Sequence, residues 1–205
     1  MDILGVDEAG RGSVLGPLVV AGVIVPEKME KVLERMGVKD SKRLAPHRRT
    51  ILSRKLRKMF EYDMIVISAR EIDEMRADGI NLNEIEKNAM EELILRLKPE
   101  KAFVDAVDVK AERFQNNLHN DTGFDIIAEH KADDNYIQVS AASIIAKAER
   151  DAHIAEINKE FIKTGGIGSG YPSDPTTKKF LTNYTYDEMP DFVRRPWATV
   201  AKMKE

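Results

Sequence analysis

Four acidic residues stand at positions where carboxylates are able to hold metal ions. Asp7 and Glu8 end a short apolar stretch at the N-terminus, Asp105 follows an apolar pair, and Asp133 follows another short apolar stretch. Carboxylates at strand ends are costly to bury unless a cation neutralises them. Four of them at one edge of a sheet carry about −4, which two divalent cations offset, and such a site supports attack on phosphate. All-oxygen ligands favour Mg²⁺ or Mn²⁺ over zinc.

Each of these acids has a plainer interpretation as a surface residue or a cap, because the chain contains 35 acidic residues. Neighbouring residues of a strand point to opposite faces. Asp7 and Glu8 therefore share a metal site only if the strand bends after them or if Glu8 contributes its backbone. The same alternation predicts that Asp108 lies on the opposite face from Asp105. Periodicity does not decide between Asp133 and the aspartate that follows it.

A glycine-rich turn comes directly after the first acidic pair. In Gly10, Arg11 and Gly12 the glycines permit close approach of a ligand to the backbone, and the peptide N–H groups and the guanidinium are suited to phosphate oxygens. Tyr171 stands between a glycine and a proline, and it is suited to stacking on a sugar or to hydrogen bonding with a 2′-OH. A plain hairpin loop and a packed loop anchor are the alternative interpretations of these two features.

Catalysis by a nucleophilic side chain is not indicated. The chain contains no cysteine, which excludes disulfides, thiolate metal sites and cysteine nucleophiles and fits an intracellular protein. Its four histidines are scattered without ligand spacing. Only His130 stands near a candidate ligand, three residues before Asp133.

Charge is segregated along a chain whose formal net charge is −3. Residues 39–58 contain nine basic residues and one acidic residue, whereas residues 61–92 contain ten acidic and three basic residues. A basic block on an acidic protein is typical either of a polyanion footprint or of a solvated helix face. Charge alone favours the helix face.

The elements that position these residues follow from hydrophobic periodicity. Strands are predicted at 3–6, 18–25, 63–68, 101–107 and 125–128, and helices at 46–60, 82–97, 112–118 and through 140–161. On the last helix Ser140, Ser143 and Lys147 share one face. Two N-terminal strands followed by alternating helices and strands predict an α/β fold, with a mixed sheet flanked by helices.

A length of 205 residues suits one domain with a small appendage. We expect a catalytic domain over residues 1–174 and a small helical C-terminal appendage, packed on that domain, over residues 175–205. The longest stretch without a charged residue spans 15 residues and is interrupted by glycine and proline, so we expect no membrane segment. The N-terminus does not resemble a signal peptide, because it lacks a basic start.

Taken together, these segments resemble one known family, ribonuclease HII (type 2 ribonuclease H), and most closely its short archaeal form. The motifs stand in the family's order: DEAGRG (7–12), GPLVVAG (16–22), KDSK (39–42), FVD (103–105), EHKAD (129–133), SAASIIAK (140–147) and GSGYPSD (168–174). The resemblance covers the chain to about residue 174. It implies a ribonuclease H-like fold and metal-dependent cleavage of RNA paired to DNA.

The resemblance also implies the chemistry in detail. Such an enzyme nicks on the 5′ side of a ribonucleotide, including a single ribonucleotide embedded in duplex DNA, and leaves a 3′-hydroxyl and a 5′-phosphate. The family's metal and catalytic carboxylates fall on Asp7, Glu8, Asp105 and Asp133, which favours Asp133 over Asp134. Its substrate-binding positions fall on Gly10, Arg11 and Gly12 with Tyr171, which sense the 2′-OH, and on Lys42, Ser143 and Lys147 near the substrate backbone.

The partners implied are RNA–DNA hybrid and ribonucleotide-containing duplex DNA, with two Mg²⁺ or Mn²⁺ ions as cofactors. The family predicts a cytoplasmic monomer that acts in DNA replication and ribonucleotide excision repair. Some archaeal relatives dock on the sliding clamp through a glutamine-led hydrophobic peptide, and the ending PWATVAKMKE lacks that spacing, which argues against clamp binding. The alternatives are a non-catalytic hybrid-binding module and another two-metal nuclease of the same fold, such as a resolvase or a proofreading exonuclease.

Overall fold

The computed structural model describes residues 1–204, and the chain divides into two compact units. The first, called the sheet unit, comprises residues 1–9, 19–65 and 83–148. The second, called the tail unit, comprises residues 10–18, 66–82 and 149 onward. The chain therefore passes between the units several times.

The sheet has five strands in the order β3-β2-β1-β4-β5. Their bounds are β1 Asp2–Ala9, β2 Leu18–Pro26, β3 Tyr62–Ile67, β4 Lys101–Asp105 and β5 Ile126–Glu129. β1 pairs antiparallel with β2, and it pairs parallel with β4, which pairs parallel with β5. The sheet is mixed, as the sequence predicted.

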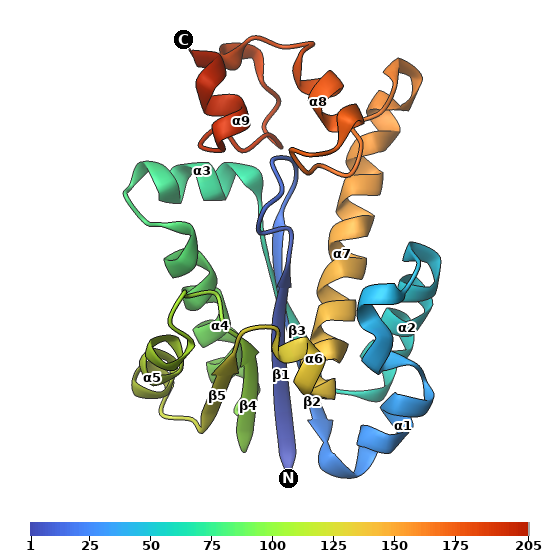
Figure 1. Ribbon diagram of the computed structural model, residues 1–205, viewed down its shortest axis with the longest axis vertical. Coiled ribbons are helices and arrows are strands. Elements are labelled where there is room, and N and C mark those ends of the chain that lie inside the picture. The colour runs from blue at the N-terminus through green and yellow to red at the C-terminus, as the bar shows by residue number, and fades with distance from the viewer. Residues whose placement is uncertain (205) are drawn as a thin grey trace. The chain divides into compact units, whose positions relative to one another are not determined.

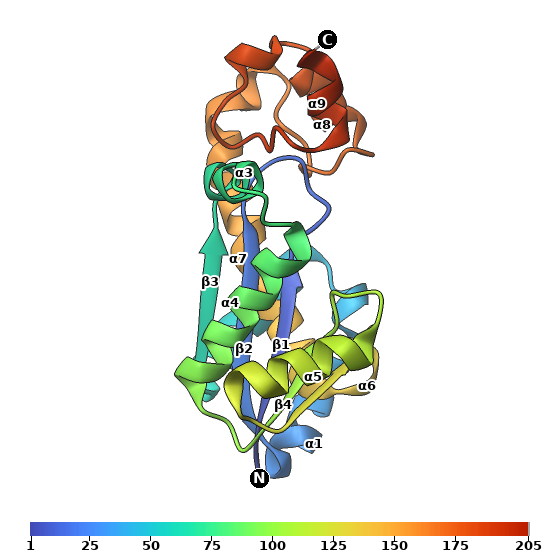
Figure 2. The same ribbon diagram turned by 90° about the vertical axis from the view of Figure 1, so that its left-hand side faces the viewer.

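Helices cover both faces of the sheet (Figures 1 and 2). In the sheet unit, α4 and α5 lie on one face, and α7 lies on the other. All residues of β2 except Pro26 are buried, which is typical of a central strand covered on both faces. The apolar composition of β2 follows from this position.

The helices of the sheet unit are α1 Glu30–Arg35, α2 Pro46–Met59, α4 Leu82–Leu97, α5 Ala111–Thr122, α6 Ala132–Asn135 and the first part of α7 Ile137–Phe161. In α4, Ile85, Ala89 and Leu93 recur every four residues and are buried, which is the stripe that packs this helix on the sheet. Gly123 follows the last residue of α5, and its positive φ of 76° suits a helix C-cap. No helix within residues 1–204 is long and apolar enough to cross a membrane.

A glycine in β1 lets α7 approach the sheet closely. A Cβ atom built on Gly5 would lie 2.1 Å from the backbone carbon and oxygen of Gln138. No side chain fits at this separation, because the obstacle is rigid backbone. Gly5 therefore sets the distance between β1 and the first turn of α7.

The tail unit is built from short helices around a hydrophobic cluster of its own. The helices are α3 Ala69–Ala77, α8 Pro175–Leu181 and α9 Ala198–Ala201, together with the second part of α7. Turns of 3₁₀ helix occupy Glu27–Met29 and Val38–Arg43 in the sheet unit, and Ile162–Thr164, Tyr186–Glu188 and Lys202–Lys204 in the tail unit. The cluster includes Leu15, Ile167, Phe180, Val193 and Val200, all buried. Residues of the glycine-rich turn region and of the C-terminal segment thus share one core.

Most predicted elements are confirmed, with shifted ends. The helix at 82–97 matches α4, and the long helix predicted through residues 140–161 matches α7, which begins at Ile137. β4 ends at Asp105, two residues before the predicted end, and α5 extends to Thr122. The boundary between a domain and an appendage at residue 174 stays a prediction.

Candidate active site

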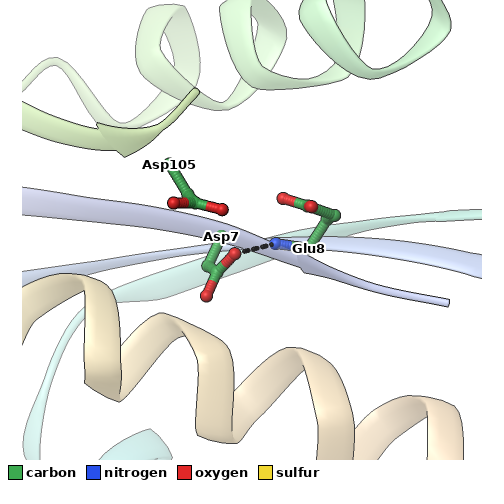
Figure 3. Close-up of side chains that lie close together, drawn as sticks. All are labelled: Asp7, Glu8 and Asp105. Carbon is green, nitrogen blue, oxygen red and sulfur yellow. Dashed lines mark hydrogen bonds between the residues drawn. The ribbon is translucent and has the colours of Figure 1, made fainter. Parts of the chain in front are cut away.

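The clearest site in the sheet unit is a group of three carboxylates. Asp7 and Glu8 lie near the end of β1, and Asp105 is the last residue of the neighbouring parallel strand β4. One carboxylate oxygen from each residue lies within 4.8 Å of the other two. Figure 3 shows the three side chains gathered beside the same stretch of β1, with Oδ1 of Asp7 accepting a hydrogen bond from the backbone N–H of Glu8 at 2.8 Å.

The structure corrects the expectation based on strand alternation. β1 keeps its antiparallel register with β2 through Asp7, Glu8 and Ala9, so no break separates the two acids. Even so, Glu8 brings a carboxylate oxygen, and not merely its backbone, into the group. The physical reason is that a glutamate side chain is one methylene longer than an aspartate side chain and is able to turn back along the strand.

The three carboxylates lie where negative charge is costly. The pKa of Asp7 is well above its usual value, because its side chain is buried and because the charges of Glu8 and Asp105 lie close to it. Burial also raises the pKa of Asp105, although the backbone N–H of Ala132, which donates to its Oδ1 at 2.9 Å, opposes the shift. A buried set of oxygen ligands with an unfavourable concentration of charge fits a hard divalent cation.

Asp133 lies near this group without being part of it. It is a residue of α6, it is 9% exposed, and its charge contributes to the raised pKa of both Asp7 and Asp105. Among the residues described, the group of mutually close ligand atoms comprises only the first three acids. The assignment of Asp133 as a fourth ligand stays a prediction.

Lys42 is the cation that reaches these acids from outside the sheet. Its Nζ lies 3.3 Å from Oδ1 of Asp133 and 2.6 Å from Oδ1 of Asp134. The hydrogen bond to Asp134 is the main reason that the pKa of Lys42 is raised. Both aspartates thus contact Lys42, but Asp133 is buried whereas Asp134 is exposed.

The residues predicted on α7 differ in accessibility. Ser140 donates its hydroxyl hydrogen to the backbone oxygen of Asp133 at 2.6 Å, which fixes the end of α6. Ser143 is fully buried, and its hydroxyl has no hydrogen-bond partner in residues 1–204, so a contact with substrate would require local movement. Lys147 is half-buried. The predicted contacts of Ser143 and Lys147 with a substrate are untested.

Two other residues considered from the sequence have partners of their own. Asp108 binds Arg113 with Nη2 at 2.6 Å, and this contact lowers the pKa of the carboxyl group. Nε2 of His130 lies 3.1 Å from the backbone oxygen of Val109. Asp108 therefore belongs to a local ion pair, as expected for a residue outside the site.

In the tail unit, the structure brings the glycine-rich turn and Tyr171 together. Gly10 has a φ of 87°, and a Cβ atom on Gly12 would lie 3.9 Å from Cε1 of Tyr171. Tyr171 is 40% exposed. The tyrosine ring is thus available to a ligand beside the exposed Gly12.

Arg150 of α7 holds both loops, and sequence reasoning missed it. Its guanidinium donates to the backbone oxygens of Pro17 at 2.7 Å and Leu15 at 3.0 Å, and to the hydroxyl of Ser13. It also lies 5.6 Å from the centre of the Tyr171 ring. Arg150 is only 4% exposed, which is unusual for an arginine in a helix. The sequence alone does not indicate that this arginine is buried.

Arg194 holds the same turn region from the C-terminal segment, and it was missed too. Its Nε donates to the backbone oxygen of Gly16 at 3.0 Å, and its Nη1 donates to the backbone oxygen of Arg11 at 3.2 Å. Arg194 is fully buried. The one sequence feature that could have indicated it is the position of Arg194 three residues before Trp197, the single tryptophan of the chain. The sequence analysis treated this segment only as an appendage.

Comparisons with known proteins identify the family of the chain. The family model described as Ribonuclease HII matches residues 4–200. A protein of Methanobrevibacter smithii named Ribonuclease HII is 80% identical over 204 residues, which cover 100% of this chain and 99% of that protein. The chain belongs to the ribonuclease HII family.

Solved structures of ribonuclease HII proteins have the same fold. The PCNA:RNase HII complex from Archaeoglobus fulgidus contains a chain with a TM-score of 0.88 and 44% identity, covering 96% of this chain and 95% of that one. The ribonuclease H2 from Pyrococcus horikoshii OT3 has a TM-score of 0.88 and 42% identity, covering 100% and 97%. The predicted ribonuclease H-like α/β fold is confirmed, and the chain is a ribonuclease H endoribonuclease of RNA–DNA hybrids.

Proposed function

We propose that the protein hydrolyses the RNA strand of RNA–DNA hybrids and also nicks duplex DNA on the 5′ side of an embedded ribonucleotide. The products are a 3′-hydroxyl and a 5′-phosphate. The observation that supports this proposal most directly is the approach of Asp7, Glu8 and Asp105 to within 4.8 Å of one another at the end of two adjacent strands.

Two divalent cations, Mg²⁺ or Mn²⁺, are the proposed cofactors. Asp7, Glu8, Asp105 and Asp133 are the proposed ligands and catalytic carboxylates. The raised pKa of Asp7 supports the proposal, because a buried carboxylate beside two others gains from a neutralising cation. When bound, such ions lower the pKa of a water molecule and stabilise a leaving 3′-oxygen. No side chain of the protein then needs to act as the nucleophile.

The other proposed roles concern substrate binding. Gly10, Arg11 and Gly12 offer backbone and guanidinium donors, and Tyr171, which is 40% exposed, offers a ring and a hydroxyl group for the 2′-OH of a ribonucleotide. Lys42 is exposed, and its ammonium group lies 3.3 Å from Oδ1 of Asp133. From this position the ammonium group is able to leave the carboxylate and bind a phosphate of the substrate. Ser143 and Lys147 are proposed near the same backbone.

The substitution Asp105→Asn tests the carboxylate site. It removes the charge of one proposed ligand and keeps the size of the side chain. We expect the variant to bind an RNA–DNA hybrid within about twofold of wild type and to lose cleavage by about 1000-fold or more, since the cations stabilise the transition state by several kcal/mol. Binding is measured by fluorescence anisotropy in Ca²⁺, and cleavage is measured in saturating Mg²⁺.

Asp108→Asn is the matched control. It removes a carboxylate three residues along the chain that binds Arg113 and lies outside the group of three. Cleavage by this variant is expected to remain near wild type. If Asp105→Asn retains most of its turnover at saturating Mg²⁺, Asp105 is not a ligand, and if wild type binds without cleaving, the protein is a hybrid-binding module.

The remaining expectations about partners and location are also proposals. We propose that the protein is a cytoplasmic monomer, which light scattering and cell fractionation test. The A. fulgidus relative was solved in a PCNA complex. In this chain Trp197 and Met203 pack against the hydrophobic cluster of the tail unit, which supports the expectation that the tail does not bind a sliding clamp. A pull-down with the clamp of the same organism tests this.

A further inference from the structure

Arg194 is a fully buried charge that is attracted by the carboxylate of Asp73 but forms no ion pair with it. It is fully buried within the tail unit, and no carboxylate of residues 1–204 lies within ion-pair distance of its guanidinium. Its Nη2 has no hydrogen-bond partner among those residues. The group instead lies over the ring of Trp197, with 4.8 Å from Cζ to the ring centre.

Arg194 donates three hydrogen bonds to backbone oxygens of the glycine-rich turn region. Its Nε and Nη1 donate to the backbone oxygens of Gly16 and Arg11, and its own backbone N–H donates to the oxygen of Val14 at 2.8 Å. The backbone N–H of Gly16 in turn donates to the oxygen of Phe192 at 2.8 Å. The segment from Arg11 to Gly16 is therefore docked on the C-terminal segment through backbone atoms.

The contact with Arg11 fixes the orientation of one peptide group. In a planar trans peptide, the carbonyl oxygen of one residue and the N–H of the next point in opposite directions. Because the carbonyl of Arg11 points inward to Arg194, the N–H of Gly12 points away from it. Gly12 is exposed, and its N–H has no acceptor within the described part of the chain.

A purely structural role explains this arrangement poorly. Burying a guanidinium costs free energy that hydrogen bonds repay only in part, and one donor of Arg194 stays unpaired. Arg150 adds a second buried guanidinium close by, and the pKa of Arg194 falls to about 9 through burial and this neighbouring charge. Local rules of folding are broken in this way mainly at functional sites.

We infer that Arg194 is a positioning residue, which aims the Gly12 N–H at the ribonucleotide by holding the Arg11 carbonyl. The inference rests on the proposed recognition of the ribonucleotide by Gly10, Arg11 and Gly12. Arg194 itself touches no substrate. It acts through the peptide group that it orients, and it makes the C-terminal segment part of the recognition apparatus.

The test compares two substrates with the variant Arg194→Met, which keeps an unbranched apolar stem and removes the donors. The first substrate is duplex DNA with one internal ribonucleotide, and the second is a long RNA–DNA hybrid. A long hybrid can bind in many positions, each of which presents a ribonucleotide to the site. The loss of one hydrogen bond to a ribonucleotide is therefore expected to reduce cleavage of the long hybrid less. We expect kcat/KM to fall at least about tenfold more on the first substrate than on the second.

Val200→Ala is the matched control for stability. Val200 is buried in the same hydrophobic cluster, and its side chain makes none of the hydrogen bonds that hold the turn. The two variants are compared at temperatures equally far below their Tm values. Val200→Ala is expected to keep the wild-type ratio between the substrates. Mn²⁺ binding to the free protein, measured by electron paramagnetic resonance, is expected to be unchanged in Arg194→Met.

A second variant, Arg194→Lys, protects the test against misfolding. It keeps the charge and the stem but loses the fork that reaches two carbonyls at once. We expect it to fold and to show the same selective loss, smaller than that of Arg194→Met. The inference is overturned if the ratio of kcat/KM between the two substrates is unchanged in Arg194→Lys and in any Arg194→Met protein that folds. It is also overturned if Val200→Ala changes this ratio equally. Failure of wild type to nick the single-ribonucleotide duplex instead overturns the proposed function.

Discussion

Asp7 is the most buried of the four proposed ligands, at 6% exposure. Its pKa is raised because burial and the neighbouring charges of Glu8 and Asp105 disfavour its ionised form. In metal-free protein the folded state therefore keeps a proton on Asp7 at a pH where the unfolded chain, with a pKa of about 3.9, has lost it. This difference lowers the free energy of unfolding as the pH rises.

The substitution Asp7→Asn removes that dependence. In EDTA we expect wild type to lose stability, relative to Asp7→Asn, as the pH rises from about 4 toward and through the raised pKa of Asp7. At pH 7.5 in EDTA the variant is expected to have the higher Tm. Mg²⁺ or Mn²⁺ is expected to raise the Tm of wild type and to leave that of the variant nearly unchanged.

Differential scanning fluorimetry across pH, with and without cations, measures these changes. A wild-type Tm that does not respond to divalent cations, together with a lower Tm for Asp7→Asn in EDTA at every pH, contradicts the assignment of Asp7. Such a result would mean that hydrogen bonding to the carboxylate, as from the N–H of Glu8, outweighs the cost of its burial.

Tyr171 supports a prediction about substrate choice. Tyr171→Ala is expected to reduce kcat/KM by about tenfold on a duplex with a lone ribonucleotide and less on a long hybrid, because it removes both the ring and the hydroxyl. Tyr171→Phe keeps the ring, so it separates stacking from hydrogen bonding to the 2′-OH. Gel-based cleavage of both substrates measures the ratio. Equal losses on both substrates after Tyr171→Ala argue against a sensor of the ribonucleotide.

Among the individual residues, the acids that follow apolar stretches could be predicted from the sequence. The charged residues that are buried in the folded protein could not. Asp7, Glu8 and Asp105 were predicted because acids at the ends of apolar stretches are conspicuous, and the structure brings them together. Arg150 and Arg194 were missed, because an arginine in a helix or a tail ordinarily lies in solvent. Only the three-dimensional packing shows that these two are buried.

At the element scale, the approach of α7 to β1 depends on Gly5. Gly5→Ala would place a methyl group 2.1 Å from the backbone of Gln138, so the helix must move. We expect a loss of about 3 kcal/mol in the free energy of unfolding, at the upper end for overpacking. Because Gly5 precedes Asp7 in the same strand, cleavage is also expected to fall.

The control for this prediction is Gly123→Ala in the same unit. A Cβ atom on Gly123 meets nothing within 4 Å, and its only penalty is a φ of 76°. That penalty is about 1 kcal/mol. Urea denaturation of the two variants measures the difference, and equal losses would show that the contact between β1 and α7 is easily relaxed.

The elements best predicted are those with strong periodicity. β1, β2 and α4 follow directly from apolar runs and from the four-residue repeat, and the structure confirms them. α3 was not predicted, although Ser68 and Glu71 form a capping box that marks its start. The helix is short and mostly polar, so its periodicity is weak, and packing within the tail unit decides its conformation.

At the scale of the whole molecule, the functional residues alternate between the two units along the chain. Asp7 and Glu8 belong to the sheet unit, whereas the turn that starts at Gly10 belongs to the tail unit. Asp105 returns to the sheet unit, and Tyr171 returns to the tail unit. The proposed metal chemistry and the proposed recognition of ribonucleotides are therefore assigned to different compact units, which no linear motif revealed.

Duplex DNA that carries one internal ribonucleotide tests the metal site and the recognition of the ribonucleotide together. Cleavage is measured in Mg²⁺, in Mn²⁺ and in EDTA, beside an all-DNA duplex and a long RNA–DNA hybrid. We predict nicking on the 5′ side of the ribonucleotide in either cation, no cleavage in EDTA, and an intact all-DNA duplex. Nicking that persists in EDTA contradicts the carboxylate metal site, and equal attack on the all-DNA duplex contradicts the roles of Arg11 and Tyr171.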